Sequence, residues 1–155
     1  MRVVVPGIPK AQPRVRAVNR GKHAGVWTPR SAEAWKAAVA VAVKAHPEFP
    51  AEPWTGPVLL HMWLLLPRPK RIMRAKDRNG PVWHTARPDY DNLAKAVADS
   101  CTQVGLWRDD AQVCDGRIVK LYTEKRGEPR AMIVAEQITW EPDGVAMEAS
   151  DDDDT

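Results

Sequence analysis

Nine consecutive residues, 58–66, with the sequence VLLHMWLLL, most constrain the fold of this chain. The run lies between Pro57 and Pro67, and His61 is its one strongly polar residue. A membrane span needs about 20 apolar residues, so the run is too short for one. A nearly continuous apolar run of this length between turn residues is typical of a strand covered on both faces. We therefore expect a central strand here, with His61 as a hydrogen-bonded core residue rather than a metal ligand.

Three further segments are predicted as strands from their β-branched and apolar composition. They are residues 2–8, 112–122 and 131–140. Because the turn sequence KRGEP at 125–129 separates the last two, we expect those two to form a hairpin. The basic segment at 10–29 contains Pro and Gly and is predicted as a loop, either a solvated connection or a DNA contact.

Two helices are predicted from apolar residues at helical spacing. The first covers residues 32–45, with Ser31 as its N-cap and a buried face around Trp35. The second covers residues 91–104 and stops before Gly105, the usual residue just past a helix C-terminus. Together with the strands, these helices place the chain in the α/β (α+β) class, as a small mixed sheet with two main helices.

At 155 residues the chain is long enough for one domain with its own core. We assign residues 1–141 to that domain and expect 142–155, which end in DDDDT, to be a disordered acidic tail. Without the four aspartates of that tail, the formal charge rises from +3 to about +7. A basic domain favours a polyanionic partner, although the same charge also fits a domain that is simply kept soluble.

Cys101 and Cys114 are the two cysteines of the sequence, and both lie in apolar runs. We expect them to be small buried side chains rather than metal ligands or a disulfide. The apolar run at the N-terminus is too short for a signal peptide, and no segment has the length of a membrane span. The sequence therefore predicts a cytoplasmic protein without membrane association.

The most basic segment is residues 67–80, PRPKRIMRAKDRNG, which directly follows the apolar run. Its prolines and poor periodicity predict a loop, and its dense positive charge favours contacts with phosphates over a purely solubilising role. The residues assigned to DNA binding are five cations of this loop and two from the acidic region that follows. They are Arg68, Lys70, Arg71, Arg74, Lys76, Arg87 and Lys120.

Two pairs of aspartates flank the second predicted helix. Asp89 and Asp91 lie at its start, and Asp109 and Asp110 lie beyond its end. The first pair can converge on one Mg²⁺ ion, which prefers carboxylate oxygens. Each pair also has a simpler explanation, since aspartate is common at helix starts and in surface turns. Neither pair alone is sufficient to predict a metal site.

Lys95 lies four residues after Asp91 and therefore on the same side of the helix. It either forms an ordinary ion pair along the helix or supplies a cation that stabilises charge on a phosphate in the transition state. Asp99 continues this face and is assigned a supporting or structural role. The combination of Lys95 with both aspartate pairs favours Mg²⁺-dependent hydrolysis of phosphodiesters.

The segments PDYDNLAKAVADS, GLWRDDAQV and DGRIVK occur in this order between residues 84 and 120. In this stretch the chain resembles the RusA family of Holliday junction resolvases, many of them encoded by phages. The resemblance implies catalytic and metal-binding roles for Asp89, Asp91 and Asp110. It implies a catalytic role for Lys95.

The same resemblance implies a homodimeric, Mg²⁺-dependent endodeoxyribonuclease that acts on four-way DNA junctions in recombination and repair, with Mn²⁺ able to replace Mg²⁺. It implies a bacterial or phage-infected cell as the setting, and a mixed α/β fold. Where some family members carry a basic residue directly before the first aspartate, this chain has Pro88, with Arg87 one position earlier.

Chain geometry limits how the two aspartate pairs meet. A helix over 91–104 is about 21 Å long, and residues 105–110 span about 20 Å at most. Asp110 therefore returns to the first pair only if the helix is shorter than predicted; otherwise the pairs meet across a dimer interface. We favour the shorter helix, because helix ends are assigned from sequence only to within a few residues.

A dimer suits a four-way junction, whose approximate two-fold symmetry requires two matched cuts. Trp54, Trp83 and Trp107 lie in predicted connections, where they either stack on a junction base or, as we favour, pack in a core or an interface. Two alternatives to the resolvase remain: a non-catalytic protein that binds branched DNA, and a nuclease that acts on flaps, forks or RNA. A hydrolase of small nucleotides is disfavoured, because the sequence has no glycine-rich phosphate loop.

Overall fold

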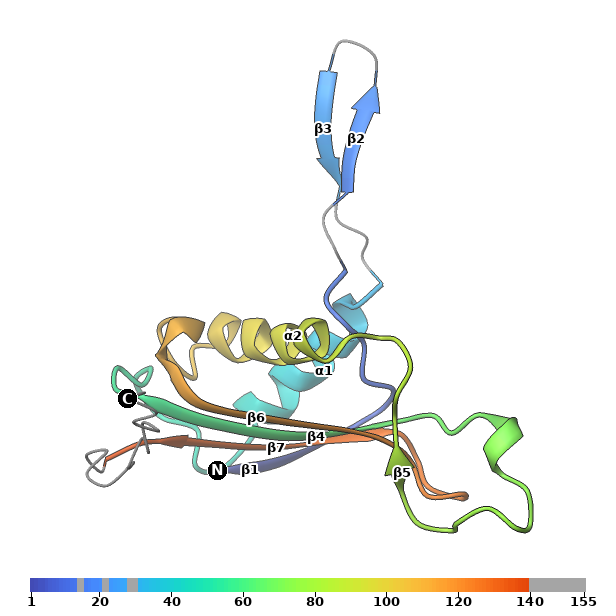
Figure 1. The fold of residues 1–155 in the computed structure, drawn as a ribbon. Helices are drawn as coiled ribbons and strands as arrows, with labels where there is room; N and C mark the ends of the chain where they lie inside the picture. The colour runs from blue at the N-terminus through green and yellow to red at the C-terminus, as the bar shows by residue number, and fades with distance from the viewer. Residues whose placement is uncertain (14–15, 21–22, 28–30, 140–155) are drawn as a thin grey trace, which may run out of the picture.

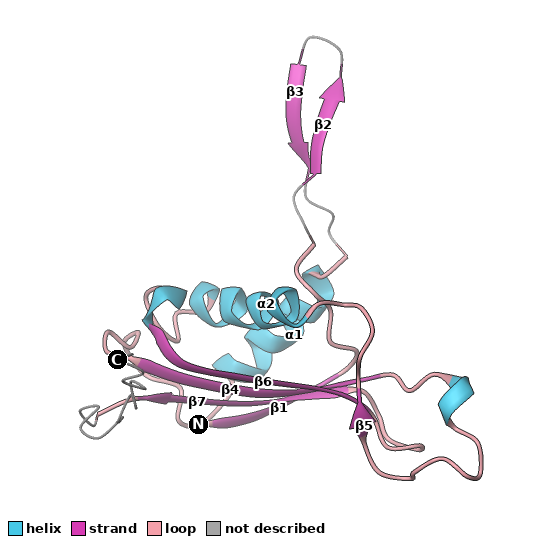
Figure 2. Ribbon diagram, in the orientation of Figure 1, coloured by secondary structure: helices cyan, strands magenta, loops and turns pink. Residues whose placement is uncertain are grey.

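The computed structural model describes residues 1–13, 16–20, 23–27 and 31–139. A five-stranded mixed sheet forms one layer, and two helices form the other (Figure 2). The strand order is β1-β7-β4-β6-β5. The strands are β1 (Arg2–Pro6), β4 (Val58–Leu66), β5 (Val82–Trp83), β6 (Val113–Tyr122) and β7 (Arg130–Gln137), and the helices are α1 (Glu33–Lys44) and α2 (Tyr90–Gln103). This architecture confirms the predicted fold class.

β4 lies at the centre of the sheet, as its apolar sequence predicts. It pairs in parallel with β6 and antiparallel with β7. Leu60, Met62 and Leu64 are buried on one face, whereas Leu59 and Trp63 are half-buried on the other. Both helices lie on the same side of the sheet (Figure 1). The prediction that β4 is covered on both faces is therefore wrong for most of the strand, where burial alternates because the helices cover one face, and it holds only at the C-terminal end, where Leu65 is buried as well.

The predicted hairpin between the last two strands is also wrong. β4 lies between β6 and β7 in the sheet, so residues 123–129 carry the chain past β4. The turn residues do reverse the chain, because β6 runs parallel to β4 and β7 runs antiparallel to it. A turn signal predicts a change of direction, but it carries no information about which strands become neighbours.

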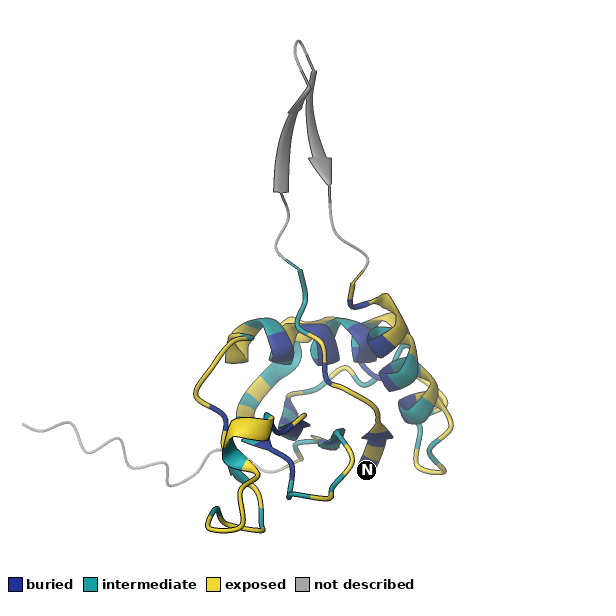
Figure 3. Cartoon of the chain, turned by 90° about the vertical axis from the view of Figure 1, so that its right-hand side faces the viewer, coloured by how far each residue is buried: buried dark blue, intermediate teal, exposed yellow. Residues whose placement is uncertain are grey.

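The core lies between the sheet and the helices, where buried segments of both layers face each other (Figure 3). Helix α1 buries Trp35, Val39 and Val43, as its periodicity predicts. Its N-cap is Ala32, whose side chain has no acceptor and provides no capping hydrogen bond, so the prediction of Ser31 as the cap is wrong. Helix α2 is held on the sheet by a row of buried residues that includes Leu93, Val97 and Cys101.

The two cysteines differ in their surroundings. Cys101 is fully buried, and burial raises the pKa of its thiol to about 12. Cys114 is exposed on β6, so the prediction that both are buried holds only for Cys101.

His61 is half-buried on the open face of the sheet, where its Nε2 lies 2.9 Å from Oδ1 of Asp115. It is hydrogen-bonded as predicted, but it is not a core residue.

Residues 16–27 contain a hairpin where the sequence predicted a loop. β2 (Arg16–Arg20) pairs antiparallel with β3 (His23–Trp27), separately from the five-stranded sheet. Figure 1 shows this hairpin projecting from the helical side of the molecule. Its strand sequences, RAVNR and HAGVW, have little apolar alternation, so the sequence pattern does not indicate strands here.

The predicted acidic tail at 142–155, and the domain boundary at 141, lie outside the described residues. In the part of the chain that the structure describes, no helix combines the length and the apolar character needed to cross a membrane.

Candidate active site

The N-terminus of α2 presents the first aspartate pair. Asp89 is the N-cap residue, with an extended backbone, and Asp91 lies in the first turn. Both are exposed, and both line an open pocket. The positive end of the helix dipole favours carboxylates at this position. The other residues that line the pocket are Thr85, Ala86, Arg87, Tyr90 and Lys120.

Helical spacing explains why the polar side chains of α2 lie on one side. The buried residues recur every four positions, which holds the opposite face of the helix away from the sheet. A second row has the same four-residue spacing but is shifted by two positions along the helix, so it faces away from the sheet. It consists of Asp91, Lys95 and Asp99.

Lys95 lies between two carboxylates. Its Nζ is 3.3 Å from Oδ1 of Asp99 on the next turn, and 4.0 Å from Oδ2 of Asp110. Asp99 also lies 3.9 Å from Nζ of Lys36 on α1. The ion pair along the helix is therefore formed with Asp99, whereas the sequence suggested Asp91 as the partner, and a long-range approach to Asp110 accompanies it. With 57% of its side chain exposed, Lys95 remains accessible to a substrate from outside.

The short 3-10 helix η2 (Asp110–Gln112) places Asp110 beside α2. Asp109 is its N-cap and accepts a hydrogen bond from the backbone N–H of Ala111 at 2.8 Å. Gln112 returns the interaction by accepting from the backbone N–H of Asp109 at 3.0 Å. This capping box uses Asp109 for structure and leaves Asp110 exposed, facing the polar side of α2.

Gln112 is a site-shaping residue that the sequence interpretation missed. Its Nε2 donates to the backbone oxygens of Trp54 and Gly56, which ties η2 to the connector before β4. The available signal was the spacing Asp-x-x-Gln from Asp109 to Gln112, which is typical of a capping box.

The two aspartate pairs do not meet within one chain. Among the residues that the structure describes, no three Asp, Glu, His or Cys side chains lie close enough together to hold a metal ion. Helix α2 has 14 residues, so it is as long as the sequence predicted. The expectation that a shorter helix returns Asp110 to Asp89 and Asp91 in the same chain is therefore wrong. The other arrangement, in which Asp110 meets them across a subunit interface, stays a prediction.

The two cations assigned to the acidic region both line the pocket at the N-terminus of α2. Arg87 is exposed. Lys120 reaches the pocket from β6, and its Nζ donates to the backbone oxygens of Ala86 and Pro88. Positive charge is therefore present beside Asp89 even though Pro88 replaces the basic residue found there in some family members.

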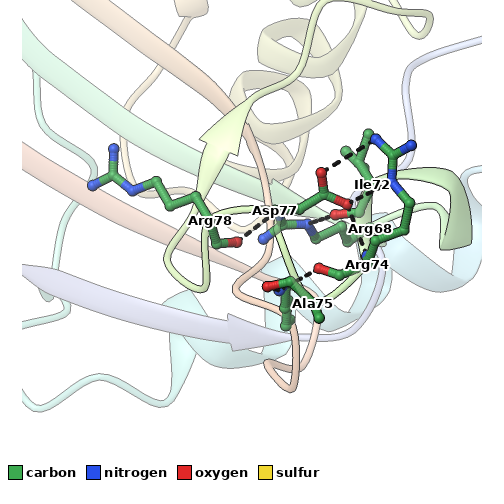
Figure 4. A network of polar contacts seen from close by, with 7 residues as sticks. Arg68, Ile72, Arg74, Ala75, Asp77 and Arg78 are labelled. Carbon is green, nitrogen blue, oxygen red and sulfur yellow. Dashed lines mark hydrogen bonds and ion pairs between the residues drawn. The ribbon is translucent and has the colours of Figure 1, made fainter.

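The basic segment after β4 is a folded loop that contains a 3-10 turn, η1 (Lys70–Ile72). Arg68 is buried, and its guanidinium donates to the backbone oxygens of Ile72, Gly80 and Arg78, as Figure 4 shows for two of them. Arg74 pairs with Asp77 across 3.2 Å, and this hydrogen bond lowers the pKa of that carboxyl. The exposed cations of the loop are Lys70, Arg71, Arg74, Lys76 and Arg78.

His84 lies next to the pocket, on the chain that leads into α2. It is buried, and its ring packs against Tyr122 with 4.2 Å between the ring centroids. Burial lowers the pKa of this imidazole below its usual value, and the nearby charge of Lys120 lowers it further. The described structure shows no hydrogen-bond partner for its Nδ1.

The three tryptophans in predicted connections have different environments. Trp107 is buried, and its indole N–H donates to the hydroxyl of Thr102 at 2.7 Å, which confirms core packing. Trp54 is half-buried and bridges to Trp107 through the backbone. Trp83 is 72% exposed on the edge strand β5. Trp83 is therefore not a core residue, and its packing in an interface stays a prediction.

The sequence of this chain is similar to a known protein family and to several known proteins. A family model described as endodeoxyribonuclease RusA matches residues 6–134. An uncharacterized protein of Bacillus subtilis, YqaN, is 29% identical over 144 residues, which cover 90% of this chain and 97% of that protein. Crossover junction endodeoxyribonucleases RusA of Escherichia coli K12 and of Enterobacteria phage 82 are 54% identical to this chain over 41 residues. That match covers 26% of this chain and 34% of each of those two proteins.

Proposed function

Because this chain belongs to the RusA family of endodeoxyribonucleases, we propose that it is a Mg²⁺-dependent enzyme that resolves Holliday junctions. The observation that carries this proposal is the open pocket in which Asp89 and Asp91 are exposed at the N-terminus of α2, beside Lys120. The match to proteins named as crossover junction endodeoxyribonucleases supports the choice of substrate. We assign the enzyme to DNA recombination and repair in the cytoplasm of a bacterial or phage-infected cell.

The proposed metal ligands are Asp89, Asp91 and Asp110. Their hard carboxylate oxygens suit Mg²⁺, and Mn²⁺ is expected to replace it. When bound, the metal ion would offset the charge of the scissile phosphate and lower the pKa of the attacking water. Lys95 would place a second positive charge beside the phosphate and stabilise the charge that develops in the transition state.

We further propose that the active form is a homodimer in which Asp110 of the partner subunit completes the pocket. The length of α2 supports this arrangement, because it keeps Asp110 of the same chain beside Lys95 rather than beside Asp89. A two-fold dimer would also present two equivalent sites to the two strands of a four-way junction that must be cut.

DNA would bind across the end of the molecule that holds both the basic loop and the N-terminus of α2, which lie at the same end in Figure 1. The proposed phosphate contacts are Lys70, Arg71, Arg74, Lys76 and Arg87, all exposed. Arg68 would contribute indirectly, because its guanidinium holds the loop together from inside. Trp83, exposed on β5, is the tryptophan best placed to stack on an unpaired base.

The first test is cleavage of a synthetic four-way junction with and without Mg²⁺. The wild type should cut only with the metal. Asp110→Asn should abolish cleavage but keep junction binding in gel shifts, because it removes a ligand and also reduces negative charge near DNA. Glu52→Gln, which makes the same change from carboxylate to amide in the exposed connector before β4, is the control and should cut normally.

The outcomes separate the alternatives. Binding by the wild type without metal-dependent cutting would identify a non-catalytic protein for branched DNA. Faster cutting of flaps, forks or RNA than of junctions would reassign the substrate. Full cutting by Asp110→Asn would remove that residue from the metal site.

A mixing experiment tests whether Asp110 acts across the dimer. Asp89→Asn and Asp110→Asn subunits should each be inactive, but a mixture that exchanges subunits should regain nicking. In the mixed dimer, one pocket then combines the unmodified Asp89 of the Asp110→Asn subunit with the unmodified Asp110 of the Asp89→Asn subunit. If both aspartates act within one chain, every pocket of the mixture stays defective and no activity returns.

A further inference from the structure

We propose that Lys120 is a positioning residue that fixes the backbone of Asp89 so that its carboxylate is presented to the metal. The inference rests on the proposed function, because it assigns Asp89 to the metal site. It replaces the interpretation of Lys120 as a simple phosphate contact.

Lys120 holds the chain leading into α2 at three points. Its Nζ donates to the backbone oxygens of Ala86 and Pro88, each at 2.7 Å. Its own backbone oxygen accepts from the N–H of His84 at 3.2 Å. Strand β6 and the segment 84–88 are thus joined through both the backbone and the side chain of one residue.

The charge of Lys120 makes these contacts strong. Hydrogen bonds from an ammonium group are shorter and stronger than those between neutral groups, and 2.7 Å lies at the short end of their range. Two carbonyl oxygens, two residues apart, converge on one Nζ, which occurs only if the backbone between them curves around it. The second of these carbonyls belongs to the residue directly before Asp89, so the contact fixes the peptide plane from which Asp89 extends.

The anchor lies in an interior strand. Lys120 is in β6, opposite Leu64 of the central strand β4, and Leu64 is fully buried. On the other side, the backbone oxygen of Asp89 accepts from the N–H of Leu93, whose side chain is also buried. Asp89 therefore lies between two fixed points, one on the sheet and one on α2. Precise placement of a metal ligand through such supporting contacts typically changes metal affinity by about 10- to 100-fold.

Lys125 provides a matched control. Its Nζ also donates to two backbone oxygens, those of Arg74 at 2.7 Å and Ala75 at 3.5 Å. This second bridge lies in the basic loop, away from Asp89. The variants Lys120→Met and Lys125→Met therefore remove the same charge and the same kind of contact at two different places.

The test measures Mn²⁺ binding by titration calorimetry, junction binding without metal, and amide hydrogen exchange over residues 84–93. Lys120→Met should weaken Mn²⁺ binding about 10-fold or more, accelerate exchange in this segment, and leave junction affinity within a factor of about two to three, the loss expected for one screened charge. Lys125→Met should change neither Mn²⁺ binding nor this exchange. Lys120→Arg should restore part of the metal affinity, because a guanidinium has enough donors for both carbonyls.

Two results would overturn the inference. One is loss of junction affinity in Lys120→Met with unchanged Mn²⁺ binding and unchanged exchange, which would make Lys120 a phosphate contact. The other is an equal effect of both variants, which would reflect the loss of charge alone. If the wild type bound no Mn²⁺ and cut no junction, the proposed function would fail, while the exchange data would still decide whether Lys120 fixes the segment.

Discussion

At the scale of single residues, neighbouring side chains of the same type have different roles in this molecule. Asp109 is used inside its own turn as a cap, whereas Asp110 faces Lys95. Arg68 and Arg71 lie in one basic loop, yet Arg68 is buried against backbone oxygens and Arg71 is exposed. Both groups are recognisable from the sequence as polar clusters, but burial and hydrogen bonding separate members with a structural role from members that are exposed.

His84 allows a prediction at the same scale. The unfolded chain titrates His84 near the ordinary pKa of about 6.5, whereas burial holds the folded pKa below that value. Below pH 6.5 the unfolded state therefore binds more protons, and the free energy of unfolding contributed by His84 falls as the pH drops. His84→Phe keeps the ring contact with Tyr122 but does not titrate.

Urea unfolding at pH 7.5 and 5.5 measures this effect. The loss of stability between the two pH values should be smaller in His84→Phe than in the wild type. Equal losses in both proteins would show that His84 does not contribute to the pH dependence.

At the scale of elements, the sequence predicts where helices and strands lie better than it predicts which strands pair with each other. β4 and α2 were located because long apolar runs and a regular helical stripe are local signals. The strand order β1-β7-β4-β6-β5 could not be predicted in this way, because strand pairing depends on residues far apart in the chain. Asp89, Asp91 and Lys95 could be grouped from the sequence, since one helix carries them. The position of Asp110 relative to them could not, because it depends on tertiary contacts through Gln112.

The one-sided helical layer predicts a difference between two leucines of β4. Leu64 is fully buried beneath the helices, whereas Leu59 is half-buried on the opposite face. Leu64→Ala should reduce the free energy of unfolding by about 2–5 kcal/mol through lost burial and a cavity. Leu59→Ala should cost clearly less, because solvent already reaches its side chain. Urea unfolding compares the two, and similar losses would indicate that both faces are equally covered.

At the scale of the whole molecule, the basic loop and the N-terminus of α2 lie at the same end (Figure 1). The cations of the basic loop are exposed apart from Arg68, and Arg87 lines the pocket at the N-terminus of α2. If the chain binds four-way junctions as proposed, counterion release should make junction affinity depend steeply on salt. Arg71→Ala should weaken binding and lower the slope of log K against log salt by about 0.9.

The matched control for this prediction is Arg2→Ala, which removes one exposed charge from β1 at the opposite edge of the sheet from β5. Its slope should remain that of the wild type. A slope equally reduced in both variants would mean that DNA responds to net charge rather than to the basic loop.

The position of β7 has a consequence for how the protein is made. Arg2 at the start of β1 pairs with Val134 in β7, and the same strand fills the place beside β4. A ribosome therefore releases the first strand long before it synthesises the strand that binds it. Until then the nascent chain carries two open strand edges, which are templates for misassociation. The sheet is complete only when β7 inserts between β1 and β4, which are both synthesised before it. The strand made latest therefore takes a position inside the sheet and not at its edge.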